Sequence, residues 1–156
     1  MKLCELLDEN HIIPQLQNRS KEGVIDELIN LFQDDPRIID LSKAKTIVLG
    51  REKIMSTGVG KNFAIPHGKT DAVKDIICAF GRSTLPIDFN SLDGQPVFLV
   101  VLLIGTDEMV NTHIKLLSRI SRMMTKDDFR ESLLKAETTK EIINVFIKEE
   151  ESYFDL

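Results

Sequence analysis

The sequence is poor in the residues that support redox or metal chemistry. It has two cysteines, three histidines and no tryptophan in 156 residues. Cys4 and Cys78 form no CxxC pair, and no HxxxH or HExxH spacing occurs, so we expect free thiols and no metal site. The residues after Met1 lack the apolar segment of a secretory signal, which favours a cytoplasmic location.

The chain also lacks a basic excess and a long apolar run. Its 20 Lys and Arg stand against 25 Asp and Glu, and the net charge of -5 argues against a nucleic-acid partner. The longest apolar run, Val97 to Ile104, is far shorter than the ~20 residues that cross a bilayer. We therefore expect no direct membrane insertion and interpret this run as a buried strand.

Apolar periodicity predicts helices that alternate with buried strands. Ser20 and Asp40 are placed to cap two helices, a third begins at Thr106 or Asp107, and Thr138 with Glu141 forms the capping box of a fourth. The predicted strands are 63–65, 76–80 and 97–104, and the stretch 56–68 is otherwise irregular and rich in glycine. The acidic end, 149–156, is expected to be frayed and solvated. Without repeats or a linker, this pattern predicts a single α/β domain.

His67 stands out because it lies between Pro66 and Gly68. Proline stiffens the approach to the ring, and glycine lets another molecule come close. A neutral imidazole can attack phosphorus near pH 7 without a strong base. The residues alone leave open that His67 is a turn histidine that only satisfies a hydrogen bond.

Groups that could hold a phosphoryl oxygen occur in other segments. Arg51 can donate two hydrogen bonds to phosphate, Thr57 offers a hydroxyl, and Gly58 and Gly60 can turn amides toward an anion. His113 lies near a helix start, where an anion is favoured. The alternatives are a helix-end arginine at the surface, a turn threonine and a core histidine. Direct ATP or NAD binding is unsupported, because no P-loop or complete dinucleotide fingerprint occurs.

The segment 51–69, REKIMSTGVGKNFAIPHGK, resembles the signature of the phosphotransferase-system enzyme IIA domains of the fructose, mannitol and nitrogen-regulatory class. The segments 86–89 (PIDF), 93–97 (DGQPV) and 112–117 (THIKLL) are similar to later parts of the same family, so the resemblance covers nearly the whole chain. One departure is Lys61-Asn62-Phe63, which replaces a stretch that often contains glycine and puts recognition of the donor in doubt.

The resemblance implies a fold, a site and partners. It implies a mixed β-sheet flanked by helices on both faces, with residues 1–156 as one enzyme IIA domain. His67 would be the phosphorylated nucleophile, with His113 and Arg51 beside it; the phosphate-binding residues would be Thr57, Gly58, Gly60 and Gly68. No cofactor or metal is implied. The donor would be the phosphocarrier HPr, and the acceptor a IIB domain or a regulated target protein.

The resemblance leaves the biological role open. A IIA sequence with REKxxSTG and no IIB or IIC segment among its 156 residues is most similar to the nitrogen-regulatory type, which signals through its phosphorylation state. A fructose- or mannitol-type domain that passes phosphate to a separate IIB domain is the alternative. A protein-binding module that is never phosphorylated, and a hydrolase that uses His67, are rivals of other classes.

Overall fold

The two central strands come from the two predicted buried segments. In the computed structural model, which describes residues 1–153, β4 (Ile77–Ile87) pairs antiparallel with β5 (Val97–Gly105). β4 is longer than predicted, and its register with β5 shifts between Arg82 and Ile87. The prediction of 97–104 as a buried strand is confirmed.

Shorter parallel strands flank this central pair. β1 (Ile12–Ile13) pairs with β4, while β2 (Phe63–Ala64) and β3 (His67–Lys69) both pair with β5. The five-stranded sheet therefore has the order β1-β4-β5-β2, with β3 beside β5 on the same side as β2. Phe63 pairs with Leu99 and His67 with Leu103, so β2 and β3 follow β5 in one unbroken register. They form an edge strand that is interrupted at Pro66, which cannot donate a backbone hydrogen bond.

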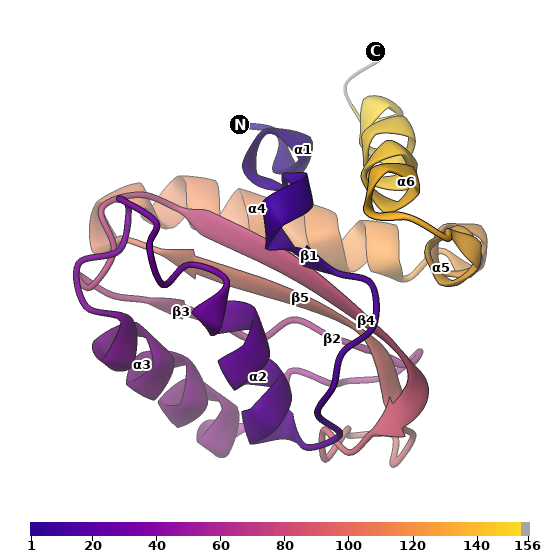
Figure 1. Ribbon diagram of the computed structural model, residues 1–156, viewed down its shortest axis with the longest axis horizontal. Coiled ribbons are helices and arrows are strands. Elements are labelled where there is room, and N and C mark those ends of the chain that lie inside the picture. Colours follow the sequence, from indigo (N-terminus) through magenta and orange to yellow (C-terminus); the bar gives the residue numbers. More distant parts are fainter. Residues whose placement is uncertain (154–156) are drawn as a thin grey trace.

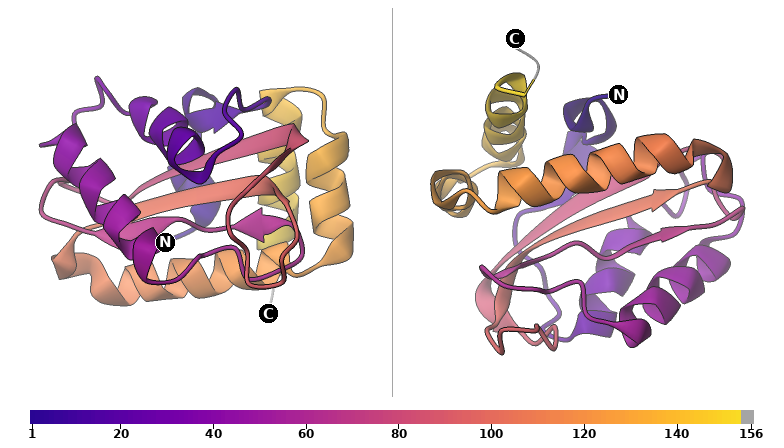
Figure 2. Two further views of the ribbon diagram at one scale, coloured as in Figure 1. Left: turned by 90° about the horizontal axis from the view of Figure 1, so that it is seen from below. Right: turned by 180° about the vertical axis from the view of Figure 1, so that it is seen from behind.

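Helices cover both faces of the sheet (Figure 1). One face carries α2 (Lys21–Asn30) and α3 (Leu41–Ile54). The other carries α4 (Val110–Met124), with α1 (Leu3–Leu6), α5 (Asp127–Lys135) and α6 (Thr139–Glu151) beyond it. Two 3₁₀ turns, η1 (Glu9–His11) and η2 (Asp107–Met109), precede β1 and α4. Figure 2 shows the edge strand between α3 and α4, on opposite faces of the sheet.

β5 joins two hydrophobic cores because alternate side chains of a strand point to opposite faces. Leu99, Val101 and Leu103 pack in the core that includes α4, α5 and α6. Val100, Leu102 and Ile104 pack in the core under α2 and α3. The mixed sheet with helices on both faces is thereby confirmed.

The predicted helix starts are confirmed, with two adjustments. The Gly23 amide donates to Ser20 Oγ at 3.1 Å, and the Lys43 amide donates to Asp40 Oδ1 at 3.1 Å. The helix predicted from Thr106 or Asp107 begins with η2 and becomes α-helical at Val110. Thr138 caps α6, but the Glu141 carboxylate accepts from the Glu137 amide, so half of the capping box is made differently.

The prediction of a frayed acidic end is wrong for residues 149–151. They belong to α6, and Glu150 is only 1% exposed. Its carboxylate accepts hydrogen bonds from the amides of Leu3, at 2.5 Å, and Cys4, at 2.9 Å. Burial of this charge is compensated because it caps α1 and pairs with Arg119. Residues 154–156, part of the same prediction, lie outside the described residues.

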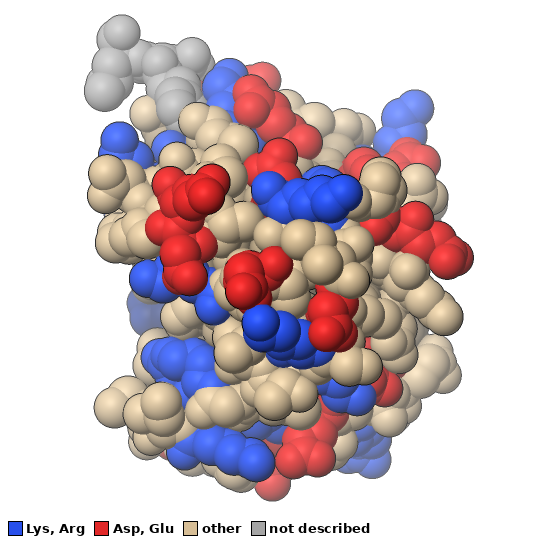
Figure 3. Space-filling model, turned by 90° about the vertical axis from the view of Figure 1, so that its left-hand side faces the viewer, with Lys and Arg blue, Asp and Glu red and all other residues tan. Residues whose placement is uncertain are grey.

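The surface carries both signs of charge. On the face drawn in Figure 3, Lys and Arg side chains are interspersed with Asp and Glu and form no single basic field. Within residues 1–153, no helix is long and apolar enough to cross a membrane.

Candidate functional site

His67 is the first residue of β3 and is partly buried. Its Nδ1 lies 2.8 Å from the Ile65 carbonyl oxygen, which can only accept, so Nδ1 carries the proton and Nε2 keeps its lone pair. Burial lowers the pKa of His67, and the positive charges of Arg51 and Lys69 lower it further, against the opposing bond to Ile65. The ring is therefore neutral near pH 7 and can act as a nucleophile through Nε2.

His113 lies beside His67, in the first turns of α4. The two ring centroids are 6.1 Å apart, with the planes at 72°. The sheet explains this proximity, because His67 pairs with Leu103 and therefore points to the face that α4 covers. The prediction that His113 faces inward is confirmed, since it is 2% exposed.

His113 carries an unused polar atom. Its Nε2 is buried and has no hydrogen-bond partner among the described residues. Burial lowers the pKa of His113 to about 4, with smaller contributions from the neighbouring His67 and from the charge of Lys69. Buried polar atoms are rarely left without a partner, so an unsatisfied imidazole nitrogen beside His67 suggests a place for a polar ligand.

Arg51 lies at the rim of this pair, in the last turn of α3. It is partly exposed, and its Nη1 donates to the Met55 carbonyl at 2.8 Å. Its charge is among those that lower the pKa of His67. The structure thus brings Arg51 within electrostatic range of His67, while His67 and His113 stand in direct contact.

Thr57 is turned toward a buried carboxylate that the sequence analysis did not single out. Both its hydroxyl and its amide donate to Glu52, which is 3% exposed and pairs with Lys21 Nζ at 3.3 Å. Because the Thr57 hydroxyl proton is engaged there, the role of Thr57 in phosphate binding stays a prediction. A signal for Glu52 was available: it follows Ala44 and Val48 at spacings of four, on the inner side of α3.

The predicted phosphate-binding glycines serve packing and turns in this structure. The Gly58 amide donates to Ser56 Oγ at 3.0 Å. A Cβ on Gly68 would lie 3.0 Å from Ile47 Cγ2, so this glycine allows α3 to approach β3. Gly60 precedes Lys61 and Asn62, which both have left-handed backbones, with φ of 59° and 65°. Contact of Gly58, Gly60 or Gly68 with phosphate therefore stays a prediction.

Lys69 is a further charged residue near the two rings. It lies two positions after His67 in β3, on the same face of the strand, and its positive charge lowers the pKa of both His67 and His113. The sequence analysis quoted Lys69 within the motif but gave it no role. Strand alternation over 67–69 would have identified it.

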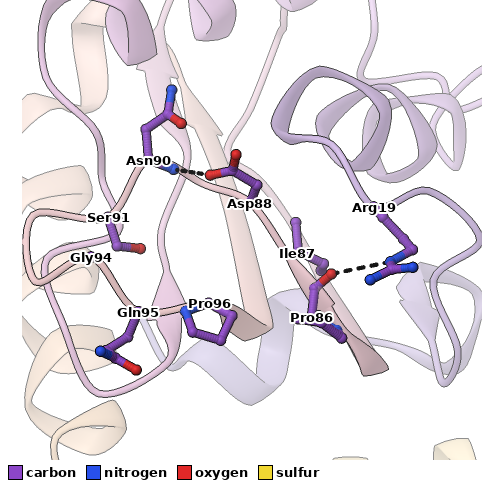
Figure 4. Close-up of a pocket in the computed structure, with 9 residues that line it drawn as sticks. All are labelled: Arg19, Pro86, Ile87, Asp88, Asn90, Ser91, Gly94, Gln95 and Pro96. Atoms are coloured by element: carbon purple, nitrogen blue, oxygen red, sulfur yellow. Dashed lines mark hydrogen bonds between the residues drawn. The ribbon is translucent and has the colours of Figure 1, made fainter.

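A cavity beside the end of β4 does not include the histidine pair. Its volume is about 640 Å³, and it is lined by Arg19, residues 86–88, Asn90, Ser91 and residues 94–96 (Figure 4). Arg19 Nε donates to the Pro86 carbonyl at 3.3 Å, and the Asn90 amide donates to Asp88 at 3.0 Å. No histidine or cysteine lines this cavity. Within residues 1–153, no group of three or more His, Cys, Asp or Glu side chains is arranged to hold a metal ion.

The edge of the mixed sheet thus carries one neutral imidazole, on β3, beside a second neutral imidazole on α4. Residues 5–149 match the family described as "Phosphoenolpyruvate-dependent sugar phosphotransferase system, EIIA 2", and the chain belongs to this family. Its members take part in phosphoryl transfer. The resemblance stated from the motifs is confirmed.

The chain is similar to relatives of two kinds. It is 39% identical over 145 residues to the fructose-specific EIIABC component of Bacillus subtilis, covering 93% of this chain but only 23% of that protein. It is 38% identical to the fructose-specific EIIA component of Haloferax volcanii, over 81% of this chain and 82% of the relative. With a nitrogen regulatory protein of Bradyrhizobium diazoefficiens it shares 34% identity, over 93% and 94% of the two chains.

Solved structures agree with the fold. The nitrogen regulatory protein IIA-Ntr of Neisseria meningitidis superimposes with a TM-score of 0.86 at 28% identity, covering 92% of this chain and 98% of that one. The mannitol IIA of Escherichia coli gives a TM-score of 0.76 at 18% identity, over 90% and 98% of the two chains, which supports the fold alone.

Proposed function

We propose that this chain is a phosphocarrier that accepts a phosphoryl group on Nε2 of His67 from phospho-HPr. The observation that carries the proposal is the bond between His67 Nδ1 and the Ile65 carbonyl at 2.8 Å. This bond fixes the tautomer, so that the lone pair is on Nε2 of a partly exposed side chain. Membership of a phosphotransferase family supports the same reaction class.

The transfer requires no metal or nucleotide in this proposal. The Nε2 lone pair attacks phosphorus in line, and the P–N bond to the donor histidine of HPr breaks as the new N–P bond forms. The electron pair of the broken bond returns to the donor nitrogen, while the proton of His67 stays on Nδ1, hydrogen-bonded to the Ile65 carbonyl. Arg51 and His113 face the charge that is spread over the phosphoryl oxygens.

Incubation with phosphoenolpyruvate, Enzyme I and HPr tests the proposal. The wild-type chain is expected to gain one acid-labile phosphate, and His67→Ala none. His11→Ala serves as the matched control, because His11 lies in η1 and stacks on Phe32, away from the pair. Phosphate uptake by His67→Ala, or its absence in wild type, would reject the proposal and favour the protein-binding module.

For the biological role we propose the regulatory, nitrogen type, in which the phosphorylation state controls binding to a target protein. The relative named a nitrogen regulatory protein aligns over 94% of its own length, and the IIA-Ntr of Neisseria meningitidis has the same fold over 98% of its chain. Transport of a fructose-type sugar is the second candidate, supported by the 39% and 38% identity to fructose-specific relatives.

Transfer to a IIB domain separates the two roles. One relative in fold, the IIA of the mannitol system, was solved in complex with phosphorylated enzyme IIB. The phosphorylated chain is mixed with purified fructose-type IIB, and label is followed on both proteins. Retention of the label on this chain is expected for the regulatory role. Rapid, stoichiometric transfer would overturn that assignment and establish the transport role.

A further inference from the structure

The third residue of β3 places a cation beside both imidazoles. Residues two apart on a strand share a face, so Lys69 points to the same side of the sheet as His67. Lys69 pairs with Gly105 of β5 in register. A Cβ on Gly105 would lie 3.6 Å from Cγ of His113, so the His113 ring packs at that same point of the sheet. Lys69 therefore flanks the two rings.

Among the described residues, the Lys69 ammonium forms no hydrogen bond or ion pair, and the side chain is exposed. Other lysines of the chain are engaged in ion pairs: Lys43 pairs with Asp71 at 2.5 Å, and Lys21 pairs with Glu52. Arg51 Nη1 donates a hydrogen bond to the Met55 carbonyl. Lys69 thus has all three of its N–H donors available for a ligand.

The charge of Lys69 reaches both rings. It lowers the pKa of His67 and of His113, whereas Arg51 is among the causes for His67 alone. A group bound between the two imidazoles would therefore lie within the electrostatic field of Lys69. A positive electrostatic potential that disfavours protonation of the two rings favours the binding of a doubly negative phosphoryl group beside them.

We propose that Lys69 is a further catalytic residue, whose ammonium group binds the oxygens of the phosphoryl group carried on His67. The inference rests on the proposed function. Lys69 forms and breaks no covalent bond and keeps its proton, so it contributes a charge-assisted hydrogen bond that strengthens as negative charge gathers on the equatorial oxygens. Its long side chain lets it follow the phosphoryl group as donor and acceptor change.

The test compares Lys69→Met, Lys69→Arg and Lys74→Met. Lys74 is the matched control, because it is also an exposed lysine whose side chain has no partner among the described residues. The measured quantity is the initial rate of labelling by phospho-HPr at low ionic strength. Lys69→Met is expected to slow labelling about tenfold to hundredfold, as for loss of one charged contact to a transferring phosphoryl group. Lys69→Arg retains most of the rate, and Lys74→Met is unchanged.

A second readout does not depend on phosphorylation. In NMR titrations of the unphosphorylated proteins, the pKa of His67 is expected to rise in Lys69→Met and to stay as in wild type in Lys74→Met. A purely structural role for Lys69 would not move this pKa in the folded protein.

The outcomes separate the two proposals. If wild type takes up no phosphate, the proposed function fails and the role of Lys69 fails with it. If wild type is labelled on His67 while Lys69→Met reacts as fast as Lys74→Met, the phosphocarrier function stands and the inference about Lys69 is rejected. An unchanged His67 pKa in Lys69→Met also rejects it, since the lysine would then lie too far from the ring.

Discussion

His67 and His113 have the same side chain but differ in exposure and in their contacts. His67 is partly exposed, and its Nδ1 is held by the Ile65 carbonyl, so Nε2 keeps the free lone pair. His113 is 2% exposed and packs beside it. Both have a lowered pKa and are neutral at pH 7. In the proposed transfer, two neutral rings cannot balance the charge of the phosphoryl group, so we expect Arg51 and Lys69 to do so.

The buried His113 makes stability depend on pH. Its pKa is about 4 in the folded chain and 6.5 ordinarily, so the unfolded chain binds more protons between these values. The contribution of neutral His113 to the unfolding free energy is complete above pH 6.5 and is lost as the pH falls toward 4. Between pH 7 and pH 5 this residue is expected to cost the wild type about 2 kcal/mol of unfolding free energy. Urea denaturation at pH 7, 6 and 5 measures it.

His113→Gln is the comparison for this prediction. The variant cannot take up a proton at that position, so its unfolding free energy should fall less over the same pH interval. Equal pH slopes for wild type and His113→Gln would show that the buried ring is not the group responsible.

At the scale of elements, the contact between α3 and β3 sets the position of the motif. Gly68 of β3 faces Ile47 and Val48 of α3, and a Cβ there would lie 3.0 and 3.5 Å from their Cγ2 atoms. Gly50, in the same helix, would meet nothing within 4 Å. Alanine substitution at these two glycines is therefore expected to change the stability of the protein in opposite directions.

Gly68→Ala is expected to destabilise the chain by about 1–2 kcal/mol, because the added methyl crowds α3 against the sheet. Gly50→Ala is expected to stabilise it by about 0.5–1 kcal/mol, because alanine favours a helix interior. Chemical denaturation of both variants measures the effects. The double variant Gly68→Ala/Ile47→Ala should recover part of the lost unfolding free energy, because it removes the side chain that the new methyl crowds. If it does not, the destabilisation does not come from this contact.

The N-terminal helix is tied to α6 through one carboxylate. Glu150 accepts from the Leu3 and Cys4 amides and pairs with Arg119 at 3.2 Å. Burial and the neighbouring Glu150 raise the pKa of Cys4 to about 11, which keeps this thiol protonated and unreactive.

Glu150→Ala is expected to lower the unfolding free energy by roughly 3 kcal/mol, the effect of breaking a buried, hydrogen-bonded ion pair. It should also lower the pKa of Cys4, with about tenfold faster alkylation by iodoacetamide at pH 8 for each unit of pKa. Glu151→Ala, next along the helix and exposed, is the control. Unchanged Cys4 reactivity in folded Glu150→Ala would contradict the proposed tie.

At the scale of the whole molecule, the sheet couples two cores that would otherwise be independent. Adjacent residues of β5, Leu102 and Leu103, belong to different cores, and both are fully buried. Loss of packing on one face must therefore disturb the strand that supports the other face.

We expect Leu102→Ala and Leu103→Ala each to lower the unfolding free energy by about 2–5 kcal/mol while the protein keeps one cooperative transition. Far-UV circular dichroism follows all helices, and fluorescence of Tyr153, the single tyrosine, follows the core around α4. The two probes should give the same midpoint. A separate early transition in Leu102→Ala would mean that the α2 and α3 face unfolds alone.

Local patterns accounted for much of the fold. The Ser20 and Asp40 caps, the apolar run at 97–104 and the inward side of α4 at His113 follow from interactions within a few residues, so the sequence indicates them directly. The short strands β1 and β3 and the helices α1 and α5 were missed. They contain two to nine residues, too few for periodicity to be distinguished, and α1 depends on a cap from a residue far along the chain.

The sequence by itself indicated the candidate residues for the proposed phosphoryl transfer: His67 between Pro66 and Gly68, and the arginine and second histidine that the family motif associates with it. Only the tertiary structure decided that Glu52 engages Thr57, that Glu150 is buried, and that Lys69 pairs with Gly105 beside the His113 ring. Hydrophobic and capping patterns act between near neighbours in the chain. The surroundings of a charge depend on which distant segments the sheet brings together, and here the parallel pairing of β3 with β5 sets His67 and Lys69 against α4.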